Sequence, residues 1–189
     1  MKYFHLFFCM FIVGSISAQS AEEKDNKSII SWKTDYLLTW GDFQGEPGKN
    51  VYARAQTSYK IEIVPRNVLV DSEDNIQGVE KLTVEAQFYK KKSFKALSNY
   101  TASLLRHEQL HFDIAELYAR KIRARFTELK AAKEAKFSLY WENYSVLWKE
   151  CRALQKEYDA TTNHGRELYI NKKWDATIKQ ELELLAKFE

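Results

Sequence analysis

Residues 99–162 read NYTASLLRHEQLHFDIAELYARKIRARFTELKAAKEAKFSLYWENYSVLWKECRALQKEYDATT and contain neither Gly nor Pro. Apolar residues recur through this stretch at the spacing of amphipathic helices. The first run is Leu104, Leu105, Ala115, Tyr118, Ile122 and Phe126, and the second is Tyr140, Tyr144, Leu147, Cys151 and Leu154. One unbroken helix of this length is unusual in a small domain, so we predict a reversal within Ala131–Ser138, with Ser138 as the N-cap of the second helix. The stretch therefore predicts a long helical hairpin.

The residues on either side complete the predicted fold. From Ala53 to Ile63 small or apolar residues alternate with polar ones, and a second alternation runs from Leu82 to Phe88. A period of two is typical of a strand with one buried face. Val68–Val70 is a candidate for a further short strand, and the apolar spacing from Trp174 to Leu185 predicts a last amphipathic helix. We expect an α+β domain, in which a small antiparallel sheet precedes the helical hairpin and a C-terminal helix.

The first residues have the pattern of a secretory signal peptide. Lys2 supplies a positive charge, an apolar run extends from Phe4 to Val13, and mostly small residues follow as far as Ala18. The run is shorter than the roughly 20 apolar residues that span a bilayer, so we favour cleavage over a membrane anchor. We place the cut near Ala18, within two residues on either side, and expect no stable membrane span after it.

Removing residues 1–18 leaves 171 residues (189 − 18), a length typical of one domain, residues 19–189. Lys2 is lost with them, so 28 basic residues (29 − 1) stand against 26 acidic ones. This near balance argues against a nucleic-acid partner. Cys151 is then the one cysteine left, which excludes an intramolecular disulfide in the exported form.

A metal-binding motif lies inside the first predicted helix, at His107-Glu108-Gln109-Leu110-His111. Two histidines four residues apart share one helix face, so both imidazoles can bind one ion, and zinc suits them. Glu108 lies beside that face, where its carboxylate can take the proton of a metal-bound water. The alternative is a solvated helix face that carries two histidines by chance. We favour the zinc site, because the motif falls in the middle of a helix with apolar flanks.

A catalytic zinc needs a third protein ligand, and His164 is the other histidine of the mature chain. If the hairpin turns near Lys133–Lys136, His107 lies about 28 residues before the turn and His164 about 29 after it. At a rise of about 1.5 Å per residue, the two histidines then lie at a similar distance from the turn along the two antiparallel helices. Gly165 lets the chain leave the helix there, with the His164 ring facing inward. From the residues alone, His164 is equally well explained as a metal ligand or as a histidine that caps the C-terminal end of the helix.

Three blocks of the chain can be compared with a known family. The first is Leu38–Gly45, which is followed by the strand carrying Ala55 and Thr57. The second is Arg106–Ala115, and the third is Tyr158–Gly165, with Trp174 after it. They resemble domain-of-unknown-function family 922, a family of bacterial proteins described as predicted secreted zinc-dependent proteases. The blocks span nearly the whole mature chain in the family's order. Asp113, unusual in familiar metalloproteases, fits the family pattern. The resemblance favours His164 as a ligand and implies a secreted zinc protease, without supplying a substrate.

The third block also supplies residues for the surroundings of the metal. Asp159 is expected either to accept the second N–H of a ligating histidine or to be the third ligand itself, and Thr162 to support the site from outside the ligands. Glu116, five residues after His111, is a further candidate ligand. Tyr158 and Tyr169 are candidate hydrogen-bond donors to an oxyanion.

We therefore expect a periplasmic or secreted zinc metallopeptidase in which Glu108 activates a zinc-bound water for attack on a carbonyl. Its partner would be a peptide or protein substrate of the cell envelope or exterior, and the strand Ala53–Ile63 could pair with an extended peptide. One alternative is a non-catalytic zinc-containing binding or assembly factor of the envelope. Another is an amidase acting on cell-wall peptides. Glu108 favours an enzyme, because a structural zinc site has no use for a base. The sequence indicates no oligomeric state.

Overall fold

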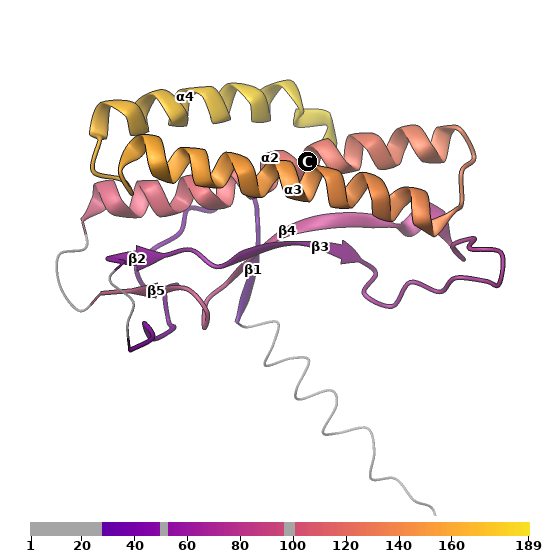
Figure 1. Cartoon of the computed structure of the whole chain (residues 1–189), viewed down its shortest axis with the longest axis horizontal. Helices are drawn as coiled ribbons and strands as arrows, with labels where there is room; N and C mark the ends of the chain where they lie inside the picture. Colours follow the sequence, from indigo (N-terminus) through magenta and orange to yellow (C-terminus); the bar gives the residue numbers. More distant parts are fainter. Residues whose placement is uncertain (1–27, 50–52, 97–100) are drawn as a thin grey trace, which may run out of the picture.

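The computed structural model describes residues 28–49, 53–96 and 101–189. The predicted signal peptide and the first residues of the predicted domain lie outside these ranges. In the described part, short strands come first and three helices follow (Figure 1). The α2–α3 pair lies between the strands and α4, where α2 is Ala102–Ala131, α3 is Phe137–Thr162 and α4 is Leu168–Leu184. The predicted α+β class is therefore confirmed.

The main sheet has three antiparallel strands in the order β1-β4-β3. They are β1 (Ile29–Ser31), β4 (Thr83–Tyr89) and β3 (Tyr59–Val64), and Ile61 lies opposite Ala86 in the register. Ile61, Val84, Ala86 and Phe88 are all buried, as their alternation predicts. This face of the sheet packs against the first long helix.

The predicted strand Ala53–Ile63 is divided in two. Strand β2 (Ala55–Gln56) pairs with β5 (Phe94–Lys95) in a separate sheet, and β3 starts at Tyr59. The division occurs at Ser58, whose backbone N–H donates to the Oγ of Ser93 rather than to a neighbouring strand. Val68–Val70 forms no strand, and of these residues Val70 makes an isolated bridge with Ile76.

The helical hairpin is present, with its reversal where the sequence places it. Helix α2 (Ala102–Ala131) and helix α3 (Phe137–Thr162) run side by side, and α4 (Leu168–Leu184) packs on α2 (Figure 1). Single 3-10 turns lie at η1 (Val79–Lys81) and η2 (Ala186–Phe188).

The prediction of Ser138 as an N-cap is wrong. The N-cap of α3 is Lys136, which makes no side-chain capping bond. The carboxylate of Asp74 accepts from the backbone N–H of Ser138 at 3.0 Å, and the Asp74 carbonyl accepts from Phe137 at 2.8 Å. A loop that precedes the hairpin in sequence thus caps α3, which local sequence does not reveal.

Helix α2 is the centre of the molecule, since all residues from 107 to 120 are buried. Several of these residues are polar, so each must find a partner inside the protein. Asp113 accepts from Trp32 Nε1 at 3.0 Å and from Gln109 Nε2 at 2.8 Å, and Gln109 Oε1 accepts from the backbone of Leu38 at 2.7 Å. These bonds fix the segment that follows β1 to α2. No helix within the described residues combines the length and apolarity needed to cross a bilayer.

Candidate metal centre

Three candidate ligand atoms meet where the second and third turns of α2 lie against the last turns of α3. The Nε2 atoms of His107 and His111 are 3.3 Å apart, and Oδ1 of Asp159 lies 3.2 Å from each of them. Both histidines are buried, and Asp159 is partly exposed. These three side chains are close enough to hold one metal ion.

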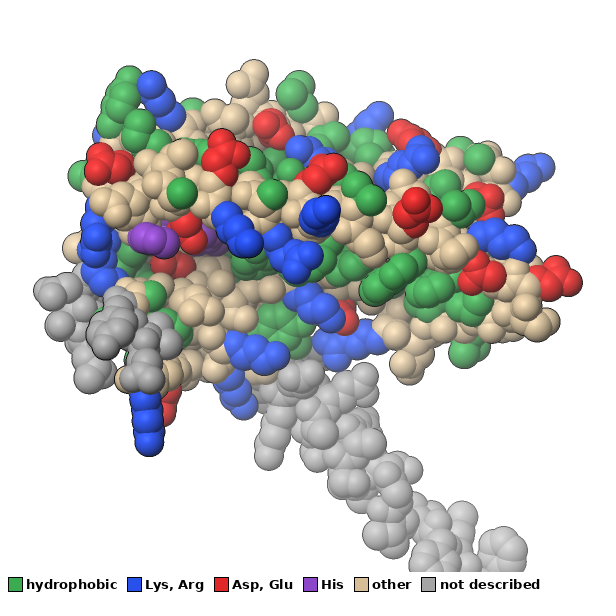
Figure 2. Space-filling view, in the orientation of Figure 1, with side chains coloured by type: hydrophobic (Ala, Val, Ile, Leu, Met, Phe, Trp, Pro, Cys, Tyr) green, Lys and Arg blue, Asp and Glu red, His purple; other side chains and the backbone are tan. Residues whose placement is uncertain are grey.

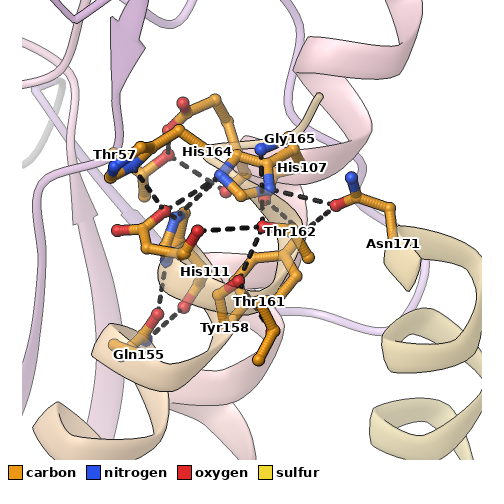
Figure 3. Close-up of polar contacts among 12 residues, drawn as sticks. Thr57, His107, His111, Gln155, Tyr158, Thr161, Thr162, His164, Gly165 and Asn171 are labelled. Atoms are coloured by element: carbon orange, nitrogen blue, oxygen red, sulfur yellow. Dashed lines mark hydrogen bonds and ion pairs between the residues drawn. The ribbon is translucent and has the colours of Figure 1, made fainter. Parts of the chain in front are cut away.

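Two amide side chains orient the imidazole rings (Figure 3). The Oε1 of Gln155, on α3, bonds to Nδ1 of His111, and the Nε2 of Gln155 donates to the His111 carbonyl at 2.8 Å. The Oδ1 of Asn171, on α4, lies 3.1 Å from Nδ1 of His107. An amide oxygen can only accept, so each Nδ1 carries the proton. The lone pair of each Nε2 is thereby left for a metal.

The charges around the cluster favour a cation. Burial acts to raise the pKa of Asp159, but its hydrogen bonds with His107 and His111 outweigh burial and hold that pKa well below its usual range. Burial acts to lower the pKa of His111, but the hydrogen bond with Asp159 and the charge of Glu108 outweigh it and raise that pKa. The site therefore stabilises a positive charge, whether of a proton or of a metal ion.

Glu108 is held beside the ligands by the sheet. It is buried, and its Oε2 accepts from the Thr57 hydroxyl at 2.8 Å. Thr57 follows strand β2, on the face that the alternation of the sequence predicts to be buried. This single contact places a carboxylate from α2 at a defined position next to the ligand cluster.

A cavity of about 550 Å³ adjoins the cluster. One wall comes from the β2 region and the other from α2 and the end of α3. Figure 2 shows histidine side chains at the surface between the helices and the sheet, so the site is open to solvent. The lining residues are Ala53, Arg54, Ala55, Gln56, Thr57, Leu104, His107, Glu108, His111, Asp159, His164 and Arg166.

His164 lines this cavity but does not belong to the ligand group. Its Nδ1 is 3.4 Å from Oδ1 of Asp159, and its side chain is 75% exposed. The hairpin does bring it level with His107: a Cβ on Gly165 would lie 2.9 Å from the Cγ of His107. Gly165 also has a φ of +79°, so this close approach requires glycine. Of the three predicted candidates for the third ligand, Asp159 has its carboxylate in the cluster, and coordination by His164 stays a prediction.

The other predicted site residues lie outside the ligand cluster. Glu116 is buried against Arg120 and Arg123. Thr162 donates to the Tyr158 carbonyl at 2.6 Å and so shapes the end of α3. Neither predicted oxyanion donor lines the cavity.

Tyr158 supports the site from behind. Its ring stacks on His107 with centroids 4.5 Å apart, and its hydroxyl donates to Oδ1 of Asn171 at 2.8 Å. Burial raises the pKa of this hydroxyl, so it stays protonated. Tyr169, in contrast, is 68% exposed and lies under Lys173.

The two amide residues that orient the histidines, Gln155 and Asn171, are not among the site residues predicted from the sequence. Gln155 lies on the apolar stripe of α3, four residues after Cys151 and three before Tyr158. A lone amide on such a stripe is a detectable signal, because a buried polar group needs a partner. Asn171 lies on the half-exposed side of α4 and carries no such signal.

The fold and the site define a class of protein: an α+β domain in which two histidines of a central helix and a carboxylate of the next helix lie close enough to hold a metal ion. The chain belongs to the family described as "Bacterial protein of unknown function (DUF922)", whose model matches residues 12–165. This confirms the resemblance found in the sequence. The match covers the whole ligand cluster, whereas Asn171 lies beyond it. No curated protein and no solved structure matches this chain.

Proposed function

We propose that this protein is an exported zinc-dependent hydrolase, and that it acts as a metallopeptidase. The observation that carries the proposal is the size of the ligand triangle, with sides of 3.2, 3.2 and 3.3 Å. Zinc bonded tetrahedrally to imidazole nitrogen and carboxylate oxygen holds its ligand atoms about 3.3 Å apart. His107, His111 and Asp159 would hold the ion, and their donor set suits zinc.

Zinc, when bound, supplies a Lewis acid that lowers the pKa of water and polarises a carbonyl group. The protein's own residues supply the rest. Glu108 acts as the general base that takes a proton from the attacking water and returns it to the leaving nitrogen. Thr57 keeps the Glu108 carboxylate turned toward the cluster. Gln155 and Asn171 hold the Nδ1 atoms and so would leave the imidazole Nε2 atoms to bind the ion.

Strand β2 supports a peptide as the substrate. The Ala96 N–H donates to the Arg54 carbonyl at 2.7 Å, and Gln56 lies opposite Phe94 on β5. Main-chain groups alternate in direction along an antiparallel pair, so those of Ala55 and Thr57 point away from β5. No other strand of the described residues pairs with that side of β2. An extended peptide can add there, within the lining of the cavity.

The signal-peptide pattern supports a periplasmic or secreted location, with a peptide of the envelope or exterior as substrate. The competing function is a zinc-containing binding or assembly factor. A buried carboxylate that is hydrogen-bonded beside the ligands, but is not one of them, favours the enzyme. A structural zinc site needs no such group.

Metal analysis combined with a peptide-library cleavage assay tests the proposal. Purified protein is expected to hold about one zinc per chain, and His107→Ala or His111→Ala to lose most of it. Glu108→Gln should keep the zinc and lose nearly all cleavage. Full zinc in both histidine variants, or unchanged cleavage by Glu108→Gln, would refute the mechanism.

The same measurements assign the third ligand. Asp159→Asn is expected to weaken zinc binding more than His164→Ala, because Asp159 lies in the cluster. The opposite ranking would make His164 the ligand.

A further inference from the structure

Two arginines beside the ligand cluster differ from the other arginines of the chain in their contacts. Arg54 and Arg166 both line the cavity, and neither side chain has a hydrogen bond, ion pair or ring contact with any residue that the structure describes. The chain has six other arginines, and each of them is engaged. Their contacts are Arg106 with Asp175, Arg120 and Arg123 with Glu116, Arg125 with Glu128, Arg152 with the Trp148 ring, and an interaction of Arg66.

These two guanidinium groups come from opposite walls of the cavity. Arg54 directly precedes β2 and is half-buried, three residues before the Thr57 that holds Glu108. Arg166 is exposed in the turn between α3 and α4, seven residues after Asp159. Lys and Arg side chains are visible beside the histidines at this end of the molecule (Figure 2).

The segments 50–52 and 97–100, which lie outside the described residues, contain no acidic side chain that could pair with these arginines. Residues 50–52 are Asn, Val and Tyr, and residues 97–100 are Leu, Ser, Asn and Tyr. The cavity's own carboxylates, Glu108 and Asp159, are engaged with Thr57 and with the two histidines. A half-buried cation without a partner is costly, so Arg54 is suited to a ligand that carries the missing negative charge.

We propose that Arg54 and Arg166 bind a carboxylate of the substrate, so that the protein selects acidic peptides. The guanidinium fork matches a carboxylate in two parallel hydrogen bonds, which gives both energy and orientation. The carboxylate belongs to an Asp or Glu side chain or to the free C-terminus of the peptide. Acidic peptides as the substrate class rest on the proposed peptidase function, but recognition of the carboxylate does not require hydrolysis.

Binding to a protein that cannot cleave separates these two claims. The zinc-loaded Glu108→Gln protein is titrated with fluorescein-labelled eight-residue peptide libraries that carry Glu or Gln at one fixed position, scanned along the peptide. Each library is made with a free and with an amidated C-terminus. We expect the acidic form at one position, or the free terminus, to bind about tenfold more tightly or better, as befits a charge-assisted pair.

Added to this background, Arg54→Gln and Arg166→Gln should each reduce that preference toward equality. Arg125→Gln is the matched control, because Arg125 is an exposed arginine of α2 that lines a different surface. Zinc content and circular dichroism must match among the variants. A preference at an internal position identifies a side-chain carboxylate, and a preference for the free terminus identifies the C-terminal one.

Equal affinities for acidic and neutral libraries, no binding of any library, or a preference that persists in both arginine variants would overturn the inference. An acidic preference in a protein whose parent cleaves no peptide would instead leave carboxylate recognition standing and remove the peptidase function.

Discussion

Thr57 joins the sheet to the proposed base, since its hydroxyl donates to the buried carboxylate of Glu108. Thr57→Val keeps the shape of the side chain and removes the donor. A hydrogen bond to a charged group is worth about 1.5–3 kcal/mol, so kcat/KM should fall by about 10- to 100-fold. Zinc content should stay at that of the parent protein, because Thr57 contacts no ligand. Steady-state kinetics with metal analysis measures both.

Thr57→Ser provides the control for this prediction, since it restores the hydroxyl and should recover most of the activity. If Thr57→Val were as active as the parent, Glu108 would not depend on the sheet for its position. If Thr57→Ser were as impaired as Thr57→Val, the methyl group and not the hydroxyl would matter.

Single residues of the site differ in how far the sequence reveals them. His107, Glu108 and His111 could be predicted, because they lie within one and a half turns of one helix and their spacing alone places them together. Asp159 lies 48 residues after His111 and comes near the histidines only because the hairpin folds back. The sequence therefore offered it as an alternative to His164, which the family resemblance favoured. Whether Asp159 or His164 lies next to the two histidines depends on which side of α3 faces α2. Side-chain packing determines this, and residue spacing does not predict it.

At the scale of elements, the hairpin and the buried faces of β3 and β4 follow from periodicity, whereas the ends of elements do not. The strand predicted over Ala53–Ile63 divides because Ser58 bonds to Ser93, a residue 35 positions away. The start of α3 likewise depends on Asp74, 64 positions before Ser138. Such boundaries are set by tertiary hydrogen bonds, which override a local pattern.

The capping of α3 by Asp74 gives a pH-dependent prediction. Hydrogen bonds from Ser138, through its hydroxyl and its backbone N–H, lower the pKa of Asp74. A carboxyl with a lowered folded-state pKa stabilises the fold above its unfolded value of about 3.9, and the contribution is lost as the pH falls through the folded value. Asp74→Asn should therefore lower Tm slightly at pH 7, by no more than about 3 °C for an exposed group.

The difference between parent and Asp74→Asn should shrink as the pH is lowered below about 4, which thermal melts across pH 2.5–7 measure. Glu73→Gln is the matched control, since the hydrogen bonds of Glu73 with Asp71 and Lys136 use its backbone. A difference in Tm that did not change with pH would assign the effect of Asp74 to something other than its charge.

At the scale of the whole molecule, α2 connects the sheet, the other helices and the C-terminal residues through a buried charge cluster. Glu116 and Arg120 are both almost fully buried, and their side chains meet at 2.9 Å. Arg120 also donates to the Leu182 carbonyl of α4 and to Glu189, each at 2.8 Å. Arg123 bonds to the same Glu116 and to the Val84 carbonyl of β4 at 2.9 Å. The sequence offered Glu116 as a metal ligand, and its structural surroundings give it this architectural role.

Arg120→Met tests how much this cluster contributes to stability. The variant keeps an apolar stem but leaves Glu116 with one arginine and removes both contacts to the C-terminal segment. Breaking one side of a buried ion pair costs about 3 kcal/mol or more, so the free energy of unfolding should fall by about that amount. Urea unfolding measures the loss, and Arg125→Gln, which breaks the exposed pair with Glu128, should cost less than about 0.5 kcal/mol.

Zinc should remain bound in Arg120→Met below its unfolding transition, because the cluster lies apart from His107, His111 and Asp159. Equal stability of the two variants would show that the contacts of Arg120 add little to the attachment of the C-terminal segment, which Arg123 and Thr34 also contact. Loss of zinc from the folded variant would show that the charge cluster also maintains the metal centre.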